Sequence, residues 1–261
     1  MMSWCVGLIG ALPASSLSWA SARLFALLVV ALGLHGCAST TASLTQPSPP
    51  ACDSADTLAR YSDLLHSMRV QKWASQYADH LQFVVQNKAR YVDVEARSGV
   101  PRALVATIHL MEASLDFNGN LLNGEPYVSV TTLYPPGRGP WATWEDAAVE
   151  GMGDLAQRKL VTNLGSVSIE QMLCLLERHN GIGYLRRGEN SPYLWSGTNH
   201  YIKGKFLERR MFFFFGPMIS YYDPEVVSQQ PGAVPFLLML FESEFVKGAP
   251  SPSGASPLAA Q

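Results

Sequence analysis

Apolar residues recur at three- and four-residue spacing through the central part of the chain, which is the pattern of amphipathic helices. From Trp73 to Ala96 this spacing predicts one continuous helix that ends at Gly99. The apolar positions are Trp73, Tyr77, Leu81, Val84, Val85, Tyr91, Val92 and Val94. Pro101 suits the first turn of the next helix, because the N–H that proline lacks has no partner there anyway. That second helix is expected to bury Leu104, Val105, Ile108, Met111 and Leu115.

Two further helices are predicted by capping boxes. Thr143 is followed three residues later by Asp146, and Ser168 is followed three residues later by Gln171. Each pair can satisfy backbone N–H groups at a helix start. A last helix is expected between residues 226 and 245, with a kink or a late start near Pro235.

The segment from Asn118 to Pro140 has a different character. It is rich in Gly, Asn and Pro around a β-branched patch at residues 128–132. This composition favours a short hairpin or a loop lobe over a helix. The pattern therefore predicts an α+β protein that is mostly α-helical, with a small β-hairpin lobe beside the helix that contains Glu112.

Composition supports one folded domain with tails. Apolar residues make up 48% of the 261 residues, and the formal net charge is -2. No dense run of Lys and Arg is present, so nucleic acid is excluded as an expected partner. The six histidines show no metal-ligand spacing, and neither a metal nor a cofactor is expected.

The first residues predict export. Arg23 is followed by an apolar run from Leu24 to Leu34, which as a helix spans only about 16 Å and is too short to cross a bilayer. Such a run is typical of a signal peptide, here residues 1–36. The sequence that ends at Cys37 resembles the lipobox of bacterial lipoproteins, and this resemblance implies that Cys37 carries a lipid and anchors the protein in the cell envelope, on its periplasmic face. Ordinary secretion with cleavage elsewhere is the alternative.

Domain boundaries follow from composition. Residues 37–55 are expected to form the lipidated cysteine and a flexible tether, residues 56–247 the folded domain, and residues 248–261 a disordered tail. In an oxidising compartment Cys52 and Cys174 either pair or stay free, and their spacing alone does not decide between these states.

Glu112 is the leading candidate for chemistry. It lies near the end of the second predicted helix, one turn after Ile108. A carboxylate held against apolar neighbours has its charged form disfavoured, so it can stay protonated near neutral pH as a general acid must. The alternative is a glutamate at a helix rim that makes one surface hydrogen bond.

The segment from Met111 to Phe117 resembles the Glu-Ser segment that opens the catalytic site of goose-type lysozymes and soluble lytic transglycosylases, with Ala113 where many of these have Ser. A wider resemblance, to a family of bacterial lysozyme-like proteins often joined to peptidoglycan-binding modules, covers roughly residues 76 to 206, about half of the chain. The matching elements are residues 90–91, 99–101, 109–117, 122–126, 131, 136–138, 144–147, 176–184 and 190–201.

This resemblance implies a lysozyme-like domain in which Glu112 is the catalytic acid. It also implies that Glu125 and Thr131, six residues apart in the predicted lobe, stand where phage-type lysozymes have an acidic residue and a threonine. A base that positions water must face the acid across the cleaved bond. If no second carboxylate does so, Glu112 alone would act first as acid and then as base, as in lytic transglycosylases. The alternative for Glu125 is an exposed turn residue.

The resemblance also implies a set of sugar-binding residues. Asn180 and Tyr184 match a segment that lines the sugar sites of transglycosylases, although His179 stands where a tyrosine is usual; a plain helix C-cap is the alternative. An aromatic loop offers flat faces for sugar rings, unless its side chains are buried under the loop. The substrate-binding candidates are His109, Asn123, Asn180, Tyr184, Tyr193, Trp195, Asn199, His200 and Tyr201.

Other acidic residues have structural explanations. Glu145 and Asp146 are expected in the first turn of a helix, where the helix dipole favours negative charge. Glu150, Glu170 and Glu177 are expected to be solvated.

The stretch Arg209 to Pro217 interrupts the resemblance. It holds four consecutive phenylalanines at residues 212–215, which need burial or a membrane surface. Core packing is one explanation, and an amphiphilic segment that dips into the lipid is the other.

The sequence thus favours an envelope lipoprotein that cleaves peptidoglycan glycan strands, by hydrolysis or by transglycosylation. A non-catalytic peptidoglycan-binding lipoprotein on the same fold is the second hypothesis, and a chitinase or chitosanase is the third.

Overall fold

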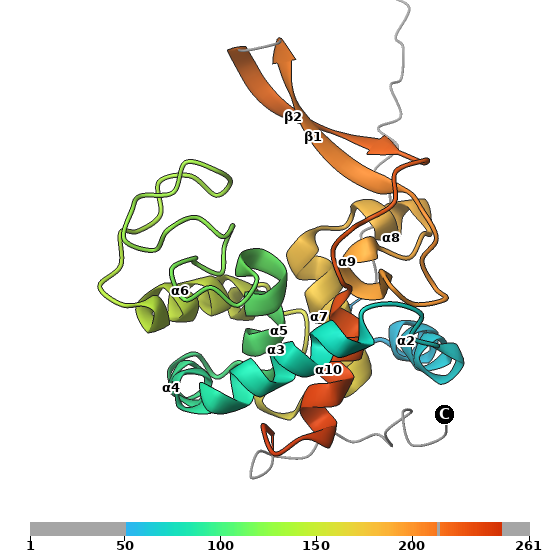
Figure 1. The fold of residues 1–261 in the computed structure, drawn as a ribbon, viewed down its shortest axis with the longest axis horizontal. Coiled ribbons are helices and arrows are strands. Elements are labelled where there is room, and N and C mark those ends of the chain that lie inside the picture. The colour runs from blue at the N-terminus through green and yellow to red at the C-terminus, as the bar shows by residue number, and fades with distance from the viewer. Residues whose placement is uncertain (1–50, 213–214, 247–261) are drawn as a thin grey trace, which may run out of the picture. The chain divides into compact units, whose positions relative to one another are not determined.

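The computed structural model describes residues 51–212 and 215–246. The described chain is mostly helical, with one small antiparallel sheet of two strands. Figure 1 shows the elements. The helices are α2 (Ala55–Ser67), α3 (Ala74–Gln86), α4 (Lys88–Ser98), α5 (Arg102–Ala113), α6 (Trp144–Gln157), η1 (Leu164–Ser166), α7 (Ile169–Asn180), α8 (Gly183–Arg187), α9 (Pro192–Trp195) and α10 (Ala233–Glu242). The strands are β1 (Lys205–Phe212) and β2 (Phe215–Asp223).

Helix α5 is the centre of the core. All residues from Ala103 to Met111 are buried, so the helix is covered on every side and not on one stripe only. Helices α4, α7 and α10 pack against it (Figure 1). A helix that is apolar all round belongs in the middle of a domain, and this one carries Glu112 at its carboxyl end.

The predicted long helix at residues 73–96 is two helices. Asn87 separates α3 from α4, and its side-chain amide donates to the carbonyl of Phe83 at 2.9 Å. The backbone N–H of Asn87 donates to the same carbonyl at 3.1 Å, and its φ of -103° departs from helical geometry, so α3 ends at this residue and a new helix starts. The predicted end at Gly99 is confirmed, because Gly99 follows α4 with a positive φ of 71°.

Both capping boxes are confirmed. Thr143 caps α6 together with Asp146, and Ser168 caps α7 together with Gln171. Helix α10 begins at Ala233, which confirms the late start near Pro235. Gly232 precedes it, and a side chain there would meet the carbonyl of Leu194 at 2.5 Å, so only glycine lets α10 start this close to α9.

The predicted β-hairpin at residues 118–140 is wrong. This segment is a loop lobe whose only ladder contact is an isolated bridge between Gly119 and Pro126. Its side chains and backbone bond each other in tight turns, which leaves no extended run for a strand. The sheet lies instead at β1 and β2, where Lys205 pairs with Asp223 and Glu208 pairs with Ser220. The described residues of the stretch that interrupts the resemblance, 209–212 and 215–217, therefore belong to these two strands.

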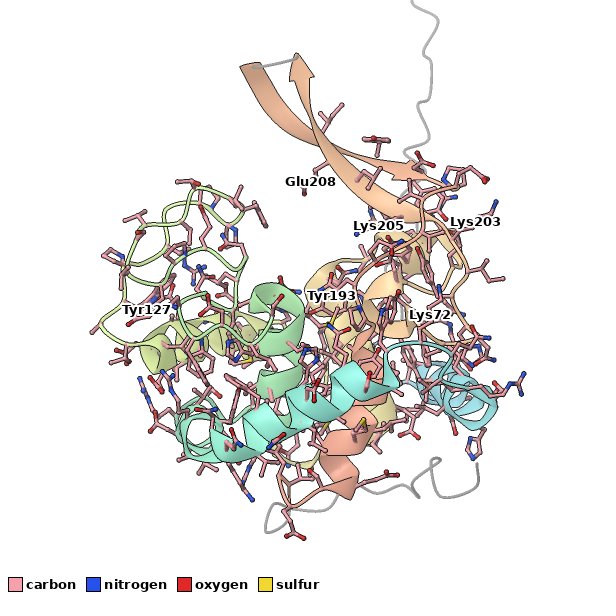
Figure 2. All side chains as sticks on the ribbon, in the orientation of Figure 1. Lys72, Tyr127, Tyr193, Lys203, Lys205 and Glu208 are labelled. Carbon is pink, nitrogen blue, oxygen red and sulfur yellow. A yellow bond between two sulfur atoms is a disulfide. The ribbon has the colours of Figure 1, made fainter. Side chains whose placement is uncertain are left out.

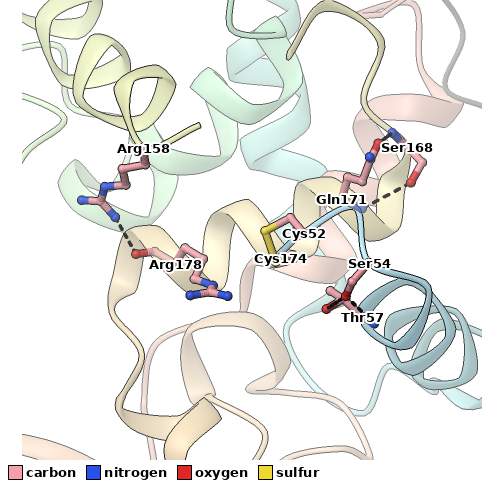
Figure 3. Close-up of a disulfide and its surroundings, with 8 residues drawn as sticks. All are labelled: Cys52, Ser54, Thr57, Arg158, Ser168, Gln171, Cys174 and Arg178. Atoms are coloured by element: carbon pink, nitrogen blue, oxygen red, sulfur yellow. Dashed lines mark hydrogen bonds between the residues drawn. A yellow bond between two sulfur atoms is a disulfide. The ribbon is translucent and has the colours of Figure 1, made fainter. Parts of the chain in front are cut away.

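A disulfide joins Cys52 to Cys174 and so fixes the start of the fold to α7 (Figure 3). Cys52 is fully buried, and Ser54 caps α2. The tether expected at residues 37–55 therefore ends before Cys52, because a buried disulfide and a helix cap are parts of the folded domain. A native disulfide typically adds about 2–4 kcal/mol of stability.

Several sequence predictions lie outside the described residues. These are the signal peptide, the lipidated Cys37, most of the tether and the tail at 248–261. The side chains of residues 209–218 are also outside them, so the membrane hypothesis for the phenylalanines stays a prediction. None of the helices in the described ranges has the length and apolar character needed to span a bilayer.

Candidate active site

Glu112 sits at the carboxyl end of α5, where the chain turns away from the core. The next residues, Ser114 and Leu115, both have positive φ angles of 52° and 64°, a conformation that residues other than glycine seldom adopt. Such backbone strain persists only where the surroundings hold it, and it is concentrated at functional sites. About 20% of the surface of the Glu112 side chain is exposed, so its carboxyl is accessible from one side.

Two polar side chains converge on one oxygen of Glu112. The hydroxyl of Tyr193 donates to Glu112 Oε1 at 2.9 Å, and Nε2 of His179 lies 3.4 Å from the same oxygen. Burial raises the pKa of Tyr193 well above its usual range, so this hydroxyl stays a donor. Within the described part of the chain, no hydrogen bond to Glu112 Oε2 is found. Oε1 is therefore held in place while Oε2 is available.

A cleft of about 350 Å³ lies next to residues that contact this carboxyl, and Glu112 is not itself one of its lining residues. Tyr193 lines the cleft and also bonds Glu112. Gln230 lines the cleft as well, and its side chain donates to the carbonyl of Met111, the residue before Glu112, at 2.9 Å. In Figure 2, Tyr193 lies beside the carboxyl end of α5, with Lys205 and Glu208 on the hairpin above it. The cleft is lined by Asn180, Gly183, Tyr184, Pro192, Tyr193, Lys205, Phe206, Glu208, Ser220, Ser228 and Gln230. Aromatic faces, hydroxyls and amides are the groups that bind sugars.

The loop lobe approaches Glu112 from the other side, and Figure 1 shows the lobe and the hairpin on either side of the end of α5. Gly124 has a positive φ of 77°, and a Cβ there would lie 2.4 Å from the carbonyl oxygen of Glu112. Glycine therefore permits the backbone of the lobe to pack directly on the end of α5.

The carboxylate of Glu125 binds its own lobe. It accepts hydrogen bonds from the Thr132 hydroxyl at 2.6 Å, from the Thr132 and Leu133 backbone N–H groups at 2.9 and 3.0 Å, and from the Asn123 amide at 3.0 Å. The bond from the Thr132 hydroxyl is the main reason that the pKa of Glu125 is lowered. Glu125 is thus an ionised group whose two oxygens already have partners.

Thr131 is also used within the lobe. Its side chain is buried, donates to the carbonyl of Pro135 at 2.7 Å and accepts from the N–H of Arg138 at 3.0 Å. The amide of Asn123 is shared between Glu125 and Asn120. The structure therefore places Asn123, Glu125 and Thr131 in one lobe, where their polar atoms bond other residues of that lobe.

His109 lies in the core. It is fully buried among Tyr91, Phe117 and Trp144, and its Nδ1 lies 2.9 Å from the Tyr91 hydroxyl. Burial lowers the pKa of His109 to about 4. This sequence candidate therefore lies away from the cleft, one helical turn below Glu112.

The predicted aromatic loop divides into two parts. Tyr193 reaches Glu112, as described. The other members fasten the loop to α2 and to the start of the hairpin. Trp195 is fully buried, His200 Nε2 lies 2.8 Å from the Leu64 carbonyl, Asn199 donates to the Ser67 carbonyl, and Tyr201 donates to the Gly204 carbonyl. Trp195 and Tyr201 are thus buried, and Asn199 and His200 are half-buried and bound to α2, so none of the four lines the cleft.

Asn180 and Tyr184 both line the cleft. Asn180 is also the last residue of α7, and Gly181 with a positive φ of 110° caps that helix. The hydroxyl of Tyr184 accepts from the N–H of Phe206 at 2.9 Å, which fixes the start of the hairpin beside the cleft. Burial raises the pKa of Tyr184 to about 12.

The prediction that Glu177 is solvated is wrong. Its side chain is 2% exposed, and the Ser191 hydroxyl donates to Oε2 at 2.6 Å. Burial raises the pKa of Glu177 to about 7. The sequence did contain a signal, because Glu177 is four residues after Leu173 and eight after Ile169, on the apolar stripe of α7. The predictions for Glu145 and Asp146 are confirmed, since both lie in the first turn of α6.

Across residues 51–212 and 215–246, no group of three or more His, Cys, Asp or Glu side chains is arranged to hold a metal ion. Comparison with known proteins found no family model that matches the chain, no similar curated protein and no similar solved structure.

Proposed function

We propose that this protein cleaves the glycan strands of peptidoglycan and that Glu112 is its general acid. The observation that carries the proposal is the state of the Glu112 carboxyl. One oxygen accepts from the Tyr193 hydroxyl and lies beside His179, the side chain is partly exposed, and Tyr193 itself lines a polar and aromatic cleft. A lysozyme-like domain is part of the same proposal, on the strength of the sequence resemblance.

The chemistry begins with proton transfer. Protonated Glu112 donates its proton from Oε2 to the glycosidic oxygen between two sugars, and the bond from C1 to that oxygen breaks. The leaving sugar keeps the proton as a hydroxyl group, and positive charge develops at C1. The carboxylate that remains lies beside this charge and is held in place through Oε1 by the Tyr193 hydroxyl.

The second half of the reaction needs a base. Glu125 has both oxygens engaged by its own lobe, which argues against it as the group that activates water. We therefore favour a single-carboxylate reaction. Glu112 removes the proton from the C6 hydroxyl, that oxygen forms a bond to C1, and a 1,6-anhydro end results, as in lytic transglycosylases.

An exported, lipid-anchored location fits this substrate. The leader, the box that ends at Cys37 and the disulfide between Cys52 and Cys174 all agree with an oxidising compartment outside the cytoplasm. The lipid anchor itself remains a proposal from the sequence.

The test is digestion of purified peptidoglycan by the full-length protein, with released products resolved by mass. We expect muropeptides with 1,6-anhydro ends, and release reduced by about 10²- to 10⁴-fold in Glu112→Gln. Glu170→Gln is a suitable control, because Glu170 lies in the first turn of α7, at the opposite end of that helix from His179.

Each other outcome supports a different hypothesis. Reducing ends in place of anhydro ends would mean hydrolysis and would return Glu125 to consideration as the base. Cleavage of chitin or chitosan in place of peptidoglycan would favour the third hypothesis of the sequence analysis. Binding to peptidoglycan without any release would contradict the enzymatic proposal and favour the binding protein.

A further inference from the structure

We propose that Glu177 is a positioning residue that acts through Ser191 and helix α9 to hold the Tyr193 hydroxyl on Glu112. This inference rests on the proposed function of Glu112. It assigns a role to a buried carboxyl group that neither lines the cleft nor touches Glu112, and that helix packing alone does not require.

The first step is the contact between Glu177 and Ser191. The Ser191 hydroxyl donates to Glu177 Oε2 at 2.6 Å, and both side chains are buried, with 2% and 0% exposure. A charge-capable acceptor that is shielded from water makes a stronger bond than an exposed one. Ser191 therefore has its hydroxyl fixed to helix α7.

The second step is the helix cap. Ser191 is the N-cap of α9: its side-chain oxygen accepts from the N–H of Leu194 at 3.3 Å, and its carbonyl accepts from the N–H of Trp195 at 3.0 Å. Because α9 spans only Pro192–Trp195, these two bonds define most of its geometry. The same hydroxyl thus donates to α7 and accepts from α9, so Glu177 fixes where this short helix begins.

The third step is the delivery of Tyr193. Tyr193 is the second residue of α9, and its hydroxyl lies 2.9 Å from Glu112 Oε1. Helix α7 also carries His179, whose Nε2 lies 3.4 Å from the same oxygen. Glu177 is two residues before His179. The carboxyl end of α7 therefore positions both side chains that approach Glu112: His179 directly, and Tyr193 through Glu177 and Ser191.

The surroundings of Glu177 explain why a carboxyl group persists in this place. Burial opposes its charge, and Arg60 of α2 and Arg178 of α7 act on it electrostatically in the opposite direction. Within the described residues, neither Glu177 Oε1 nor the Tyr61 hydroxyl has a hydrogen-bond partner. An apolar residue of similar size would avoid this cost but could not accept from Ser191. The hydrogen bond from Ser191 is therefore what a carboxyl group provides in this place and an apolar side chain would not.

The experiment compares four variants of the full-length protein on peptidoglycan. Ser191→Ala and Glu177→Ala remove the bond, whereas Ser191→Thr keeps the hydroxyl and Glu177→Gln keeps an acceptor oxygen. We expect kcat to fall on the order of ten- to a hundredfold in the two alanine variants with little change in KM, because a misplaced catalytic group affects the chemical step. The two conservative variants should restore kcat.

Thr143→Ala is the matched control, since Thr143 is likewise an N-cap with a backbone hydrogen bond, but on α6 and away from the cleft. It should lower thermal stability to a similar extent and leave kcat unchanged. An equal loss of kcat in Thr143→Ala and Ser191→Ala would overturn the proposal, because the loss would then follow stability alone.

A second readout does not depend on turnover. The carbon bonded to the hydroxyl in a labelled tyrosine gives an NMR signal that responds to hydrogen bonding, and Tyr193→Phe identifies the signal of Tyr193. We expect this signal to shift in Ser191→Ala and to stay in place in Thr143→Ala. If the parent protein released no product while the signal still shifted in Ser191→Ala, the proposed function would fail and the coupling would stand. A signal that stays in place in Ser191→Ala and in Glu177→Ala would refute the coupling.

Discussion

The two regions on either side of Glu112 use their polar groups in opposite ways. In the loop lobe, Glu125 and Thr131 direct their polar atoms at neighbouring residues of the same lobe. On the side of α7 and α9, Tyr193 and His179 direct theirs at Glu112. The lobe is thus held together by the residues that the resemblance suggested for catalysis, while the opposite side supports the carboxyl itself.

This difference shows that a residue type in a suitable sequence position does not establish a role. A carboxylate with four hydrogen bonds from its own loop stabilises that loop, and it would have to lose some of them to act on a substrate. A hydroxyl that crosses between helices to one carboxyl oxygen has a more direct connection to chemistry. The following variants test this contrast, from the largest expected effect to the smallest.

The largest effect should be a pH dependence of folding stability caused by Glu177. Burial raises its pKa from 4.5 to about 7, so between these values the folded protein keeps a proton that the unfolded chain releases. Stability should therefore fall as pH rises through this window, by up to about 3 kcal/mol. The side chain in Glu177→Gln does not titrate, so the folding stability of this variant should not show this pH dependence.

The measurement is urea unfolding of the parent and of Glu177→Gln at pH 4.5, 5.5, 7 and 8. The comparison is needed because His109, whose pKa burial lowers to about 4, has the opposite effect: it costs stability as pH falls below about 6.5. Subtracting the two proteins removes the His109 contribution. A difference that does not change with pH would mean that Glu177 is not buried as the structure shows.

The next effect is that of Tyr193→Phe on product release. The change removes one hydroxyl from Glu112 Oε1 and leaves the ring, so packing is retained. Once Glu112 has given up its proton the Tyr193 hydroxyl bonds a carboxylate, and a hydrogen bond to a charged group is worth about 1.5–3 kcal/mol, so we expect release to fall about ten- to a hundredfold. Tyr77→Phe is the control, because the buried Tyr77 hydroxyl bonds the Gly232 carbonyl and Tyr77 does not line the cleft. Release at the parental rate in Tyr193→Phe would show that Glu112 works without this contact.

Thr131→Val should act on stability and not on release. The buried Thr131 hydroxyl joins the Pro135 carbonyl to the Arg138 N–H, and valine would leave both unpaired. We expect a loss of about 1–2 kcal/mol in urea unfolding with kcat unchanged at a temperature where the variant is folded. A large loss of kcat in the folded variant would instead support the catalytic role that the resemblance implied.

The smallest effect expected is that of Glu125→Gln on release, within about twofold of the parent, because the amide oxygen can still accept part of the lobe's hydrogen bonds. Release assays at a saturating peptidoglycan concentration measure it. If release falls as far as in Glu112→Gln, Glu125 is the base and the contrast between the two regions does not hold.

Local patterns in the sequence predicted much of the helical framework. The boxes at Thr143 and Ser168, the end at Gly99 and the late start near Pro235 all depend on hydrogen bonds or backbone geometry within a few residues, and all were confirmed. The break at Asn87 was missed, because the apolar spacing continues across it and the break lies in the backbone conformation of this one residue and its bonds to the Phe83 carbonyl.

The candidate site was predicted less completely. Tyr193, Asn180 and Tyr184 belong to the cleft, as proposed, whereas His109 and Trp195 are core residues. Polar and aromatic residues suit a core as well as a sugar site, so their type does not distinguish the two. Gln230 and Phe206 were missed, because both follow the last matching element of the resemblance, residues 190–201.

The sequence by itself determined where α6, α7 and α10 begin and where α4 ends, that Glu112 lies near the end of an apolar helix, and that residues 118–140 are not helical, because caps, periodicity and glycine content act over short distances. Only the tertiary structure decided that Glu112 keeps an available oxygen, that the Glu125 carboxylate bonds its own loop and that Glu177 is buried. That distinction depends on partners far apart in the chain, such as Tyr193 for Glu112 and Ser191 for Glu177, and no local pattern contains it.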